Sequence, residues 1–244
     1  MLVDVHAHLE FDTIKEQLDA VLARAKAVGV TDIITAGSHP GANRDAISIA
    51  EQHPGVHVAL GLYPDQIGAD TASELAFIRH QEIVAIGECG LDFHITDDRE
   101  KHETQKDLFR AQIRLAHELN LPLIVHSRKA EEACLDILEE MDAKKVVMHC
   151  FEGNKKLIER AVSMGYYVTA TPNIARAEQV QLRVAMTPLR QLLTETDSPF
   201  LGPKREETNE PANVTLAVQG IAQIKSITEE ECANIIYMNY RKLF

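Results

Sequence analysis

Short apolar runs rich in β-branched residues alternate with longer amphipathic stretches along the whole chain. The runs have the length and composition of buried strands, and the stretches between them carry apolar residues at helical spacing. Glycine, proline and asparagine separate the two kinds of segment. Eight strands are predicted, at residues 2–6, 30–36, 56–60, 83–87, 123–126, 146–149, 166–170 and 191–194. Helices are predicted at residues 13–28, 43–52, 72–80, 102–119, 131–141, 155–164, 212–225 and 228–237.

This repeated strand–helix order predicts an α/β fold, specifically a (β/α)8 TIM barrel. The chain has 244 residues and 45% hydrophobic content, which suits a barrel forming one domain over residues 1–244. A doubly wound open sheet is the competing arrangement. It usually carries a glycine-rich phosphate loop after the first strand, and none is present here.

The net charge is −12, from 25 basic and 37 acidic residues. This balance argues against binding of long duplex nucleic acid through a broad basic face. A short polyanionic end held by divalent ions stays compatible with it, because bound cations reverse the local field. The sequence has no apolar run long enough to cross a membrane and no signal-peptide pattern, and its four cysteines are scattered. We therefore expect a cytoplasmic protein with reduced thiols and no membrane association.

Potential metal ligands stand near the ends of five predicted strands. His6 and His8 are separated by one residue, so on a strand their side chains project to the same side. The strand ends of a TIM barrel form one mouth, where barrel enzymes place their active sites. Four histidines and two carboxylates are more ligands than one tetrahedral ion can bind, but they suit two ions that share a bridging carboxylate. The other four candidates are Glu88, His126, His149 and Asp197.

Each candidate also has an ordinary structural explanation. Glu88 could be a solvated acid, His126 and His149 could be hydrogen-bonded core histidines, and Asp197 could cap a turn before Ser198. The occurrence of all of them at equivalent positions favours a shared metal site at the C-terminal mouth of the strands.

Six short motifs follow one another along the chain. They are Asp4-Val5-His6-Ala7-His8, Gly87-Glu88-Cys89-Gly90-Leu91-Asp92, Pro122-Leu123-Ile124-Val125-His126-Ser127-Arg128, His149-Cys150-Phe151-Glu152-Gly153, Glu195-Thr196-Asp197-Ser198-Pro199 and Asn209-Glu210-Pro211-Ala212-Asn213. In this order and spacing, the chain resembles the TatD-like metal-dependent deoxyribonucleases of the amidohydrolase-like barrel superfamily.

The resemblance implies two divalent ions, and histidine and carboxylate ligands together accept Mg, Mn, Zn or Co. One would be held by His6, His8 and Asp197 and the second by His126 and His149, with Glu88 bridging both. It also implies hydrolysis of DNA phosphodiester bonds, as a 3′–5′ exonuclease acting on single-stranded or accessible ends. Asp197 and Glu88 are the catalytic candidates, and Asp197 would orient the attacking water or accept its proton. No obligate protein partner is implied.

Three further residues are candidates for substrate binding. Arg128 follows His126 by two residues and offers a planar guanidinium to a phosphate. Arg205 lies with Lys204 after the eighth strand, where both could equally be solvated surface charges. Tyr63 occupies a position where many members of the family have histidine, so it keeps a hydroxyl but loses a group that titrates near neutral pH.

Neighbouring residues in these motifs are expected to have supporting roles. Alternation puts Asp4 on the same side as His6, where it would orient an imidazole. Cys89 and Cys150 should turn toward the helices as buried packing residues. Glu210, with Asn209, suits the start of the following helix and is expected to be mainly structural.

Two other functions use the same residues. An amidohydrolase or lactonase would attack a carbonyl at the same two-metal site, but many such enzymes carry a carbamylated lysine on the fourth strand, where this chain has Glu88. A non-enzymatic, metal-stabilised binding protein would show degraded ligand positions, and none is degraded here.

Overall fold

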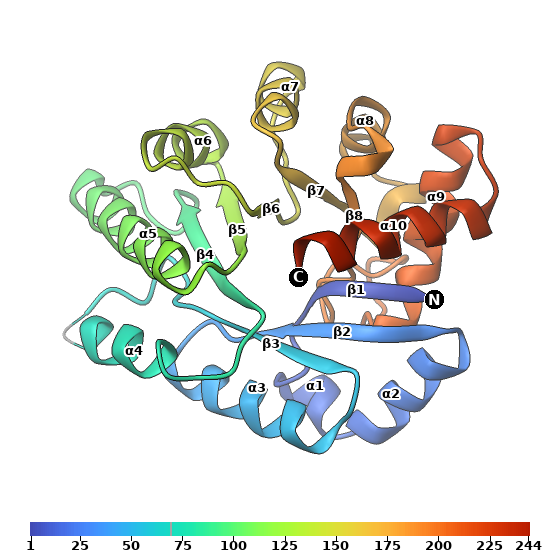
Figure 1. Cartoon of the computed structure of the whole chain (residues 1–244), viewed down its shortest axis with the longest axis horizontal. Coiled ribbons are helices and arrows are strands. Elements are labelled where there is room, and N and C mark those ends of the chain that lie inside the picture. Colours follow the sequence, from blue (N-terminus) through green and yellow to red (C-terminus); the bar gives the residue numbers. More distant parts are fainter. Residues whose placement is uncertain (69) are drawn as a thin grey trace.

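The computed structural model describes residues 1–68 and 70–244. In this part of the chain eight parallel strands form one sheet, in which each strand pairs with the next along the sequence. Figure 1 shows the sheet curving into a barrel with the helices around its outside. The strands are β1 Leu2–Ala7, β2 Val30–Ala36, β3 Val56–Leu60, β4 Ala85–Asp92, β5 Leu123–Arg128, β6 Val146–Met148, β7 Tyr167–Ala170 and β8 Leu192–Thr194. The predicted (β/α)8 TIM barrel is confirmed.

The helices follow the strands in turn. They are α1 Asp12–Lys15, α2 Leu18–Ala27, α3 Pro40–Gln52, α4 Thr71–Ile78, α5 Arg99–Leu119, α6 Glu131–Glu140, α7 Lys155–Ser163, α8 Glu178–Met186, α9 Val214–Lys225 and α10 Glu229–Leu243. Short 3₁₀ helices are η1 Pro172–Ala175, η2 Leu189–Gln191 and η3 Pro211–Asn213. Across the described residues, no helix combines the length and apolar character needed to span a bilayer.

Two helix predictions were wrong. The helix expected at residues 13–28 is divided into α1 and α2, because Gln17 lies outside the helical region with φ −131° and ψ 26°. Helix α8 was not predicted between the seventh and eighth strands. Its buried face contains Arg183 beside Val180 and Val184, and this charged residue interrupts the apolar pattern that would have indicated a helix.

Strand β4 begins later and ends later than predicted, so Glu88 lies within the strand and not at its end. The glycines around Glu88 suggested a strand end, but pairing with β5 continues from Cys89 to Asp92. Gly90 has φ +137°, and a Cβ atom there would lie 2.0 Å from the carbonyl oxygen of His126. Glycine therefore permits the close approach of the two strands beside the candidate site, and the longer strand brings Asp92 to the mouth.

Side chains of β1 alternate between the barrel interior and the helix layer. Val3 and Val5 pack in one apolar cluster with Ile221 of α9 and with Ile236 and Tyr240 of α10. Asp4 and His6 consequently point in the opposite direction, and both are 0% exposed. The predicted convergence of the first-strand polar residues inside the barrel follows from this packing.

The barrel closes between β1 and β8 through a few polar contacts. Thr194 Oγ1 donates to the carbonyl oxygen of Val3 at 2.7 Å. Asp4 Oδ1 accepts from the Thr196 backbone N–H at 2.8 Å, and Asp4 Oδ2 accepts from Thr196 Oγ1 at 2.5 Å. The Asp197 backbone N–H then donates to the carbonyl oxygen of His6 at 2.9 Å. These contacts hold the two ends of the sheet together at the level of the candidate ligands.

The expected role of Asp4 was therefore wrong. Its carboxylate accepts from the backbone N–H of His6 at 3.3 Å, and its remaining contacts are to Thr196, not to an imidazole. Burial raises its pKa to about 8, although hydrogen bonds from Thr196 oppose the shift. Alternation correctly placed Asp4 inside the barrel, but the position of β8 decided what it contacts.

We predict that Asp4→Ala destabilises the barrel by about 2–4 kcal/mol, because the buried donors of Thr196 and His6 lose their acceptor. Asp4→Asn keeps one acceptor oxygen and should be affected less. Urea unfolding of the metal-stripped protein measures both free energies. Equal stability of Asp4→Ala and the wild type would contradict a closing role for this carboxylate.

Candidate metal centre

His6 of β1 and His8, the first residue after this strand, meet at their Nε2 atoms, which are 3.2 Å apart. His8 is fixed from its other side, since its Nδ1 lies 2.9 Å from the carbonyl oxygen of Ala36 and 3.1 Å from Glu10 Oε1. His6 is fully buried, and its Nδ1 has no hydrogen-bond partner among the described residues. The two rings are therefore fixed with one nitrogen of each directed at a common point.

Glu88 lies between two pairs of histidines. Its Oε2 is 3.4 Å from His8 Nε2 and 3.8 Å from His6 Nε2. Its Oε1 is 2.9 Å from His126 Nδ1 and 3.9 Å from His149 Nε2. Burial opposes ionisation of Glu88, but hydrogen bonds from His126 and His8 outweigh it and hold the pKa well below the usual range.

Asp197 approaches the same space from the segment after β8. Its Oδ1 is 3.5 Å from His6 Nε2, 3.6 Å from His8 Nε2 and 3.8 Å from His149 Nε2. The backbone of Asp197 has φ +54°, a left-handed conformation that is uncommon outside glycine. This turn directs the carboxylate into the mouth instead of along the strand.

These separations fit ligands around a shared ion. Two atoms that each lie about 2.1 Å from a tetrahedral ion are about 3.4 Å apart, which is longer than most hydrogen bonds. Among the described residues, four sets of potential ligands lie within 4.8 Å of one another; three are drawn from the six residues predicted from the sequence, and the fourth is His149, Cys150 and Glu195. Imidazole nitrogens and carboxylate oxygens together are suitable donors for zinc, manganese and cobalt. The buried residues thus fit a metal centre, as the sequence predicted. The three predicted sets are His6, His8 and Glu88; His6, His149 and Asp197; and Glu88, His126 and His149.

Three outer carboxylates that were not among the predicted site residues contact these histidines. Glu10 contacts His8 as described, and Glu195 Oε2 lies 2.8 Å from His149 Nδ1. Asp92 Oδ2 lies 3.2 Å from His126 Nε2. A carboxylate partner fixes the orientation and tautomer of a ligating imidazole. Two of these carboxylates could have been found from the sequence, because Glu10 is two residues from His8 and Glu195 is two residues from Asp197.

Tyr63 joins the group around His126. Its hydroxyl donates to Asp92 Oδ2 at 2.7 Å and lies 3.0 Å from His126 Nε2. Burial lowers the affinity of His126 for a proton, but hydrogen bonds with Asp92 and Glu88 raise its pKa to about 9. Tyr63 thus lies directly against a candidate ligand.

Five of the six candidate ligands line a cleft of about 360 Å³, and the sixth, His6, is fully buried. Tyr63 and Arg128, two of the predicted substrate-binding residues, also line it. Arg205 is exposed in the segment after β8 and is not among the lining residues. Lys204 is exposed and forms an ion pair with Glu207 at 2.5 Å. The structure therefore brings together Tyr63 and Arg128 with the metal centre, but not Arg205.

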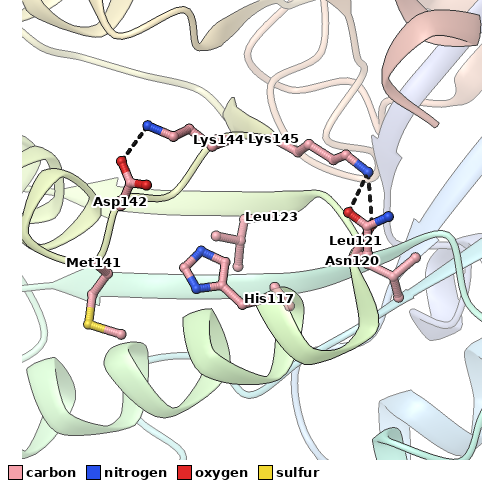
Figure 2. Close-up of a pocket in the computed structure, with 9 residues that line it drawn as sticks. His117, Asn120, Leu121, Leu123, Met141, Asp142, Lys144 and Lys145 are labelled. Atoms are coloured by element: carbon pink, nitrogen blue, oxygen red, sulfur yellow. Dashed lines mark hydrogen bonds and ion pairs between the residues drawn. The ribbon is translucent and has the colours of Figure 1, made fainter.

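A larger cavity, of about 430 Å³, lies at the beginnings of β5 and β6 and so at the opposite end of the barrel (Figure 2). Its cations have local partners, because Lys144 contacts Asp142 and Lys145 contacts Asn120. Active sites of TIM barrels lie at the other end of the strands. Size alone does not make this cavity the functional site.

The two cysteines next to candidate ligands behave differently. Cys89 is fully buried in an apolar cluster, which agrees with a packing role. Cys150 was expected to do the same, but its Sγ lies 3.0 Å from Glu195 Oε1. Its backbone has φ +43°, so the alternation assumed for an extended strand does not apply at this position. Cys150 therefore belongs to the polar surroundings of His149.

Glu210 and Asn209 stabilise the segment after β8. Glu210 forms an ion pair with Arg24 of α2 at 2.6 Å. Asn209 is buried and donates to the carbonyl oxygens of Thr196 and Phe200, each at 2.7 Å. These contacts are consistent with the expected structural role of Glu210, and they show that Asn209 helps to hold the loop that carries Asp197.

Comparisons with known proteins show which family the chain belongs to. The family described as TatD related DNase matches residues 3–244. An uncharacterized metal-dependent hydrolase, YabD of Bacillus subtilis, is 37% identical over 254 residues, covering 100% of this chain and 99% of the relative. The 3′-5′ ssDNA/RNA exonuclease TatD of Erwinia tasmaniensis is 30% identical, covering 100% and 99%.

Solved structures agree as well. The TatD homologue YJJV of Escherichia coli superposes with a TM-score of 0.91 at 28% identity, covering 100% of this chain and 97% of that one. The chain belongs to the TatD-related DNase family, and it is a metal-dependent hydrolase of that family.

We predict that the contact between Glu195 and His149 stabilises the metal-stripped protein, and that this stabilisation is lost in acid. Burial opposes ionisation of Glu195, but His149 and Thr169 lower its pKa to about 2, below the ordinary value of 4.5. The stability from this group is complete above about pH 4.5 and is lost as the pH falls toward 2. Glu195→Gln should lower the unfolding free energy at neutral pH and make its decline with acid shallower.

Urea unfolding in chelator at pH 7 and in steps from pH 5 down to pH 2 measures this change. Glu207→Gln is the matched control, because its carboxylate is exposed in a surface ion pair. Parallel pH profiles for Glu195→Gln and the wild type would contradict the coupling.

Proposed function

We propose that this protein hydrolyses DNA phosphodiester bonds from the 3′ end of single-stranded or otherwise accessible strands. It would use two divalent ions, drawn from Mg, Mn, Zn or Co, and the whole chain would act as one catalytic domain. The arrangement of Glu88 carries the proposal, because its two oxygens face different histidine pairs. A carboxylate in this position is suited to bridge two ions. The Erwinia relative is described as a 3′-5′ ssDNA/RNA exonuclease, which supports the proposed substrate class and the proposed direction of cleavage.

The ligand assignment is the one that the family resemblance implies, and the distances among the six side chains are compatible with it. His6, His8 and Asp197 would hold one ion, and His126 and His149 the other. When bound, divalent ions supply positive charge to the phosphate and lower the pKa of a water molecule. Two bound divalent ions would carry more charge than the two ligating carboxylates, so the ligand layer would attract an anionic phosphate despite the net charge of −12.

Asp197 is the residue we propose to orient the attacking water and accept its proton. Its side chain is 12% exposed and lines the cleft, so it is accessible to a small molecule while it faces the histidines. Arg128 lines the same cleft, where its planar guanidinium would bind a phosphate oxygen. Arg205 lies outside the cleft and remains a predicted contact for a more distant part of the strand.

The preference for single strands follows from size and charge. A cleft of about 360 Å³ is near the lower end of the range for ligand pockets and suits a nucleotide better than a duplex. The acidic balance of the whole chain disfavours extended contacts with a duplex backbone.

We place the protein in the cytoplasm, and the four free cysteines support this because thiols persist in reducing compartments.

Metal replacement tests the reaction directly. We expect the metal-stripped protein to be inactive on a 5′-labelled single strand and to regain stepwise shortening from the 3′ end with one or more of the four ions. A 3′-blocked strand and a blunt duplex are the controls. Turnover of a lactone or amide, with no DNA cleavage under any ion, would instead identify an amidohydrolase or lactonase.

Asp197→Asn should abolish turnover more than substrate binding, because the amide keeps the size of the side chain but cannot accept a proton from water. We expect kcat to fall at least about 100-fold, a typical loss for a general base, with a smaller change in the Kd for a single strand. Metal content, measured by mass spectrometry, separates a chemical role from lost ion binding. Equal losses of binding and turnover at unchanged metal content would contradict this role.

A further inference from the structure

Two phenylalanines on the rim of the cleft are exposed to solvent. Phe11 is 40% exposed and Phe200 is 47% exposed. Their ring centroids lie 5.3 Å apart with the planes at 84°, so one ring presents its edge to the face of the other. Both line the cleft that contains the candidate metal ligands. A pair of exposed aromatic rings here forms an apolar surface beside an otherwise polar centre.

The backbone fixes these rings relative to the candidate ligands. The N–H of Phe200 donates to the carbonyl oxygen of Asp197 at 2.7 Å, and its own carbonyl accepts from Asn209. The two loops are joined by the N–H of His8, which donates to the carbonyl oxygen of Ser198 at 2.7 Å. The rings of Phe11 and Phe200 lie 5.5 and 6.2 Å from the ring of His8, measured between centroids. The two phenylalanine rings are therefore held next to the ring of His8, a candidate metal ligand.

The chemistry of this surface selects a flat ligand. Phenylalanine offers no hydrogen bond, so it recognises a π face and not a particular base. Arg128 lines the same cleft and supplies a cation for a phosphate. A nucleotide combines both features, because its base is flat and its phosphate is anionic.

We propose that Phe11 and Phe200 form a stacking subsite for one nucleobase next to the scissile phosphate. The inference rests on the proposed function and specifies how the strand is held: the base lies on the phenylalanines while its phosphate lies over the candidate metal centre. Because stacking tolerates every base, the subsite binds single strands without sequence preference. A base inside a duplex has both faces covered by its stacked neighbours, so the subsite also disfavours internal positions of a duplex.

A fluorescent variant tests stacking without requiring hydrolysis. The chain contains no tryptophan, so Phe200→Trp introduces a single reporter that preserves an aromatic ring. We expect a five-residue oligothymidylate to quench its emission, and an abasic phosphodiester chain of the same length to leave it unchanged. The same Phe200→Trp protein carrying Asp197→Asn allows the measurement with Mg²⁺ present and turnover suppressed.

Met238→Trp is the matched control. Met238 is 69% exposed on α10, and its neighbour Asn239 contacts the carbonyl oxygen of Leu192 at the beginning of β8, away from the mouth. Emission from this variant should not respond to either strand. Equal responses to the base-containing and abasic strands at position 200, or none to either, would overturn the stacking subsite.

Kinetics separate this inference from the proposed function. Phe11→Leu and Phe200→Leu should each raise KM for a single strand about tenfold, the loss of one stacking contact. kcat should change little, and hydrolysis of a strand that is abasic at the terminal position should be unaffected. Wild-type hydrolysis with unchanged KM in both variants would overturn the subsite and leave the proposed function standing. Base-dependent quenching without hydrolysis under any ion would overturn the proposed function and support the subsite.

Discussion

The contact on which the rest of this structure depends is the closure of the barrel between β1 and β8. A buried carboxylate, Asp4, accepts the backbone N–H and hydroxyl of Thr196, while the backbone N–H of Asp197 donates to His6. Residues about 190 positions apart in the chain are thereby brought within hydrogen-bond distance. Without these contacts, His6 and His8 would not lie next to the carboxylate of Asp197, which follows the last strand. The fold and the metal centre therefore share one set of interactions.

The candidate metal centre has an inner and an outer layer of charge. The inner layer directs imidazole nitrogens and the carboxylates of Glu88 and Asp197 at a common space. The outer layer consists of three carboxylates, on Glu10, Asp92 and Glu195, which contact the far side of three histidines. Ring orientation is thus determined before any ion binds, and this reduces the reorganisation that binding requires. The surplus of buried carboxylates also favours a cation at the centre.

Substrate selection depends on residues that surround this centre without belonging to it. Tyr63 contacts Asp92 and His126 on one side, and the two phenylalanines of the rim stand beside His8 on another. The hydroxyl can form a hydrogen bond and the two rings can contact a flat apolar face, whereas the charged centre suits ions and phosphate. The family accounts for the metal-dependent hydrolysis, whereas these side chains are candidates for what this particular chain prefers among nucleic-acid substrates.

The sequence by itself determined the barrel and the six candidate ligands. Periodicity and glycine spacing located the strands, and alternation placed His6 and His8 on the inner side of β1. Local patterns failed where a polar residue is buried, as at Arg183 in α8, and where a strand continues through glycine, as in β4. Only the tertiary structure decided that Asp4 contacts Thr196, that Glu195 supports His149 and that Phe11 meets Phe200. Periodicity reports which side of an element a residue occupies, but its partner across the mouth depends on how distant strands come together.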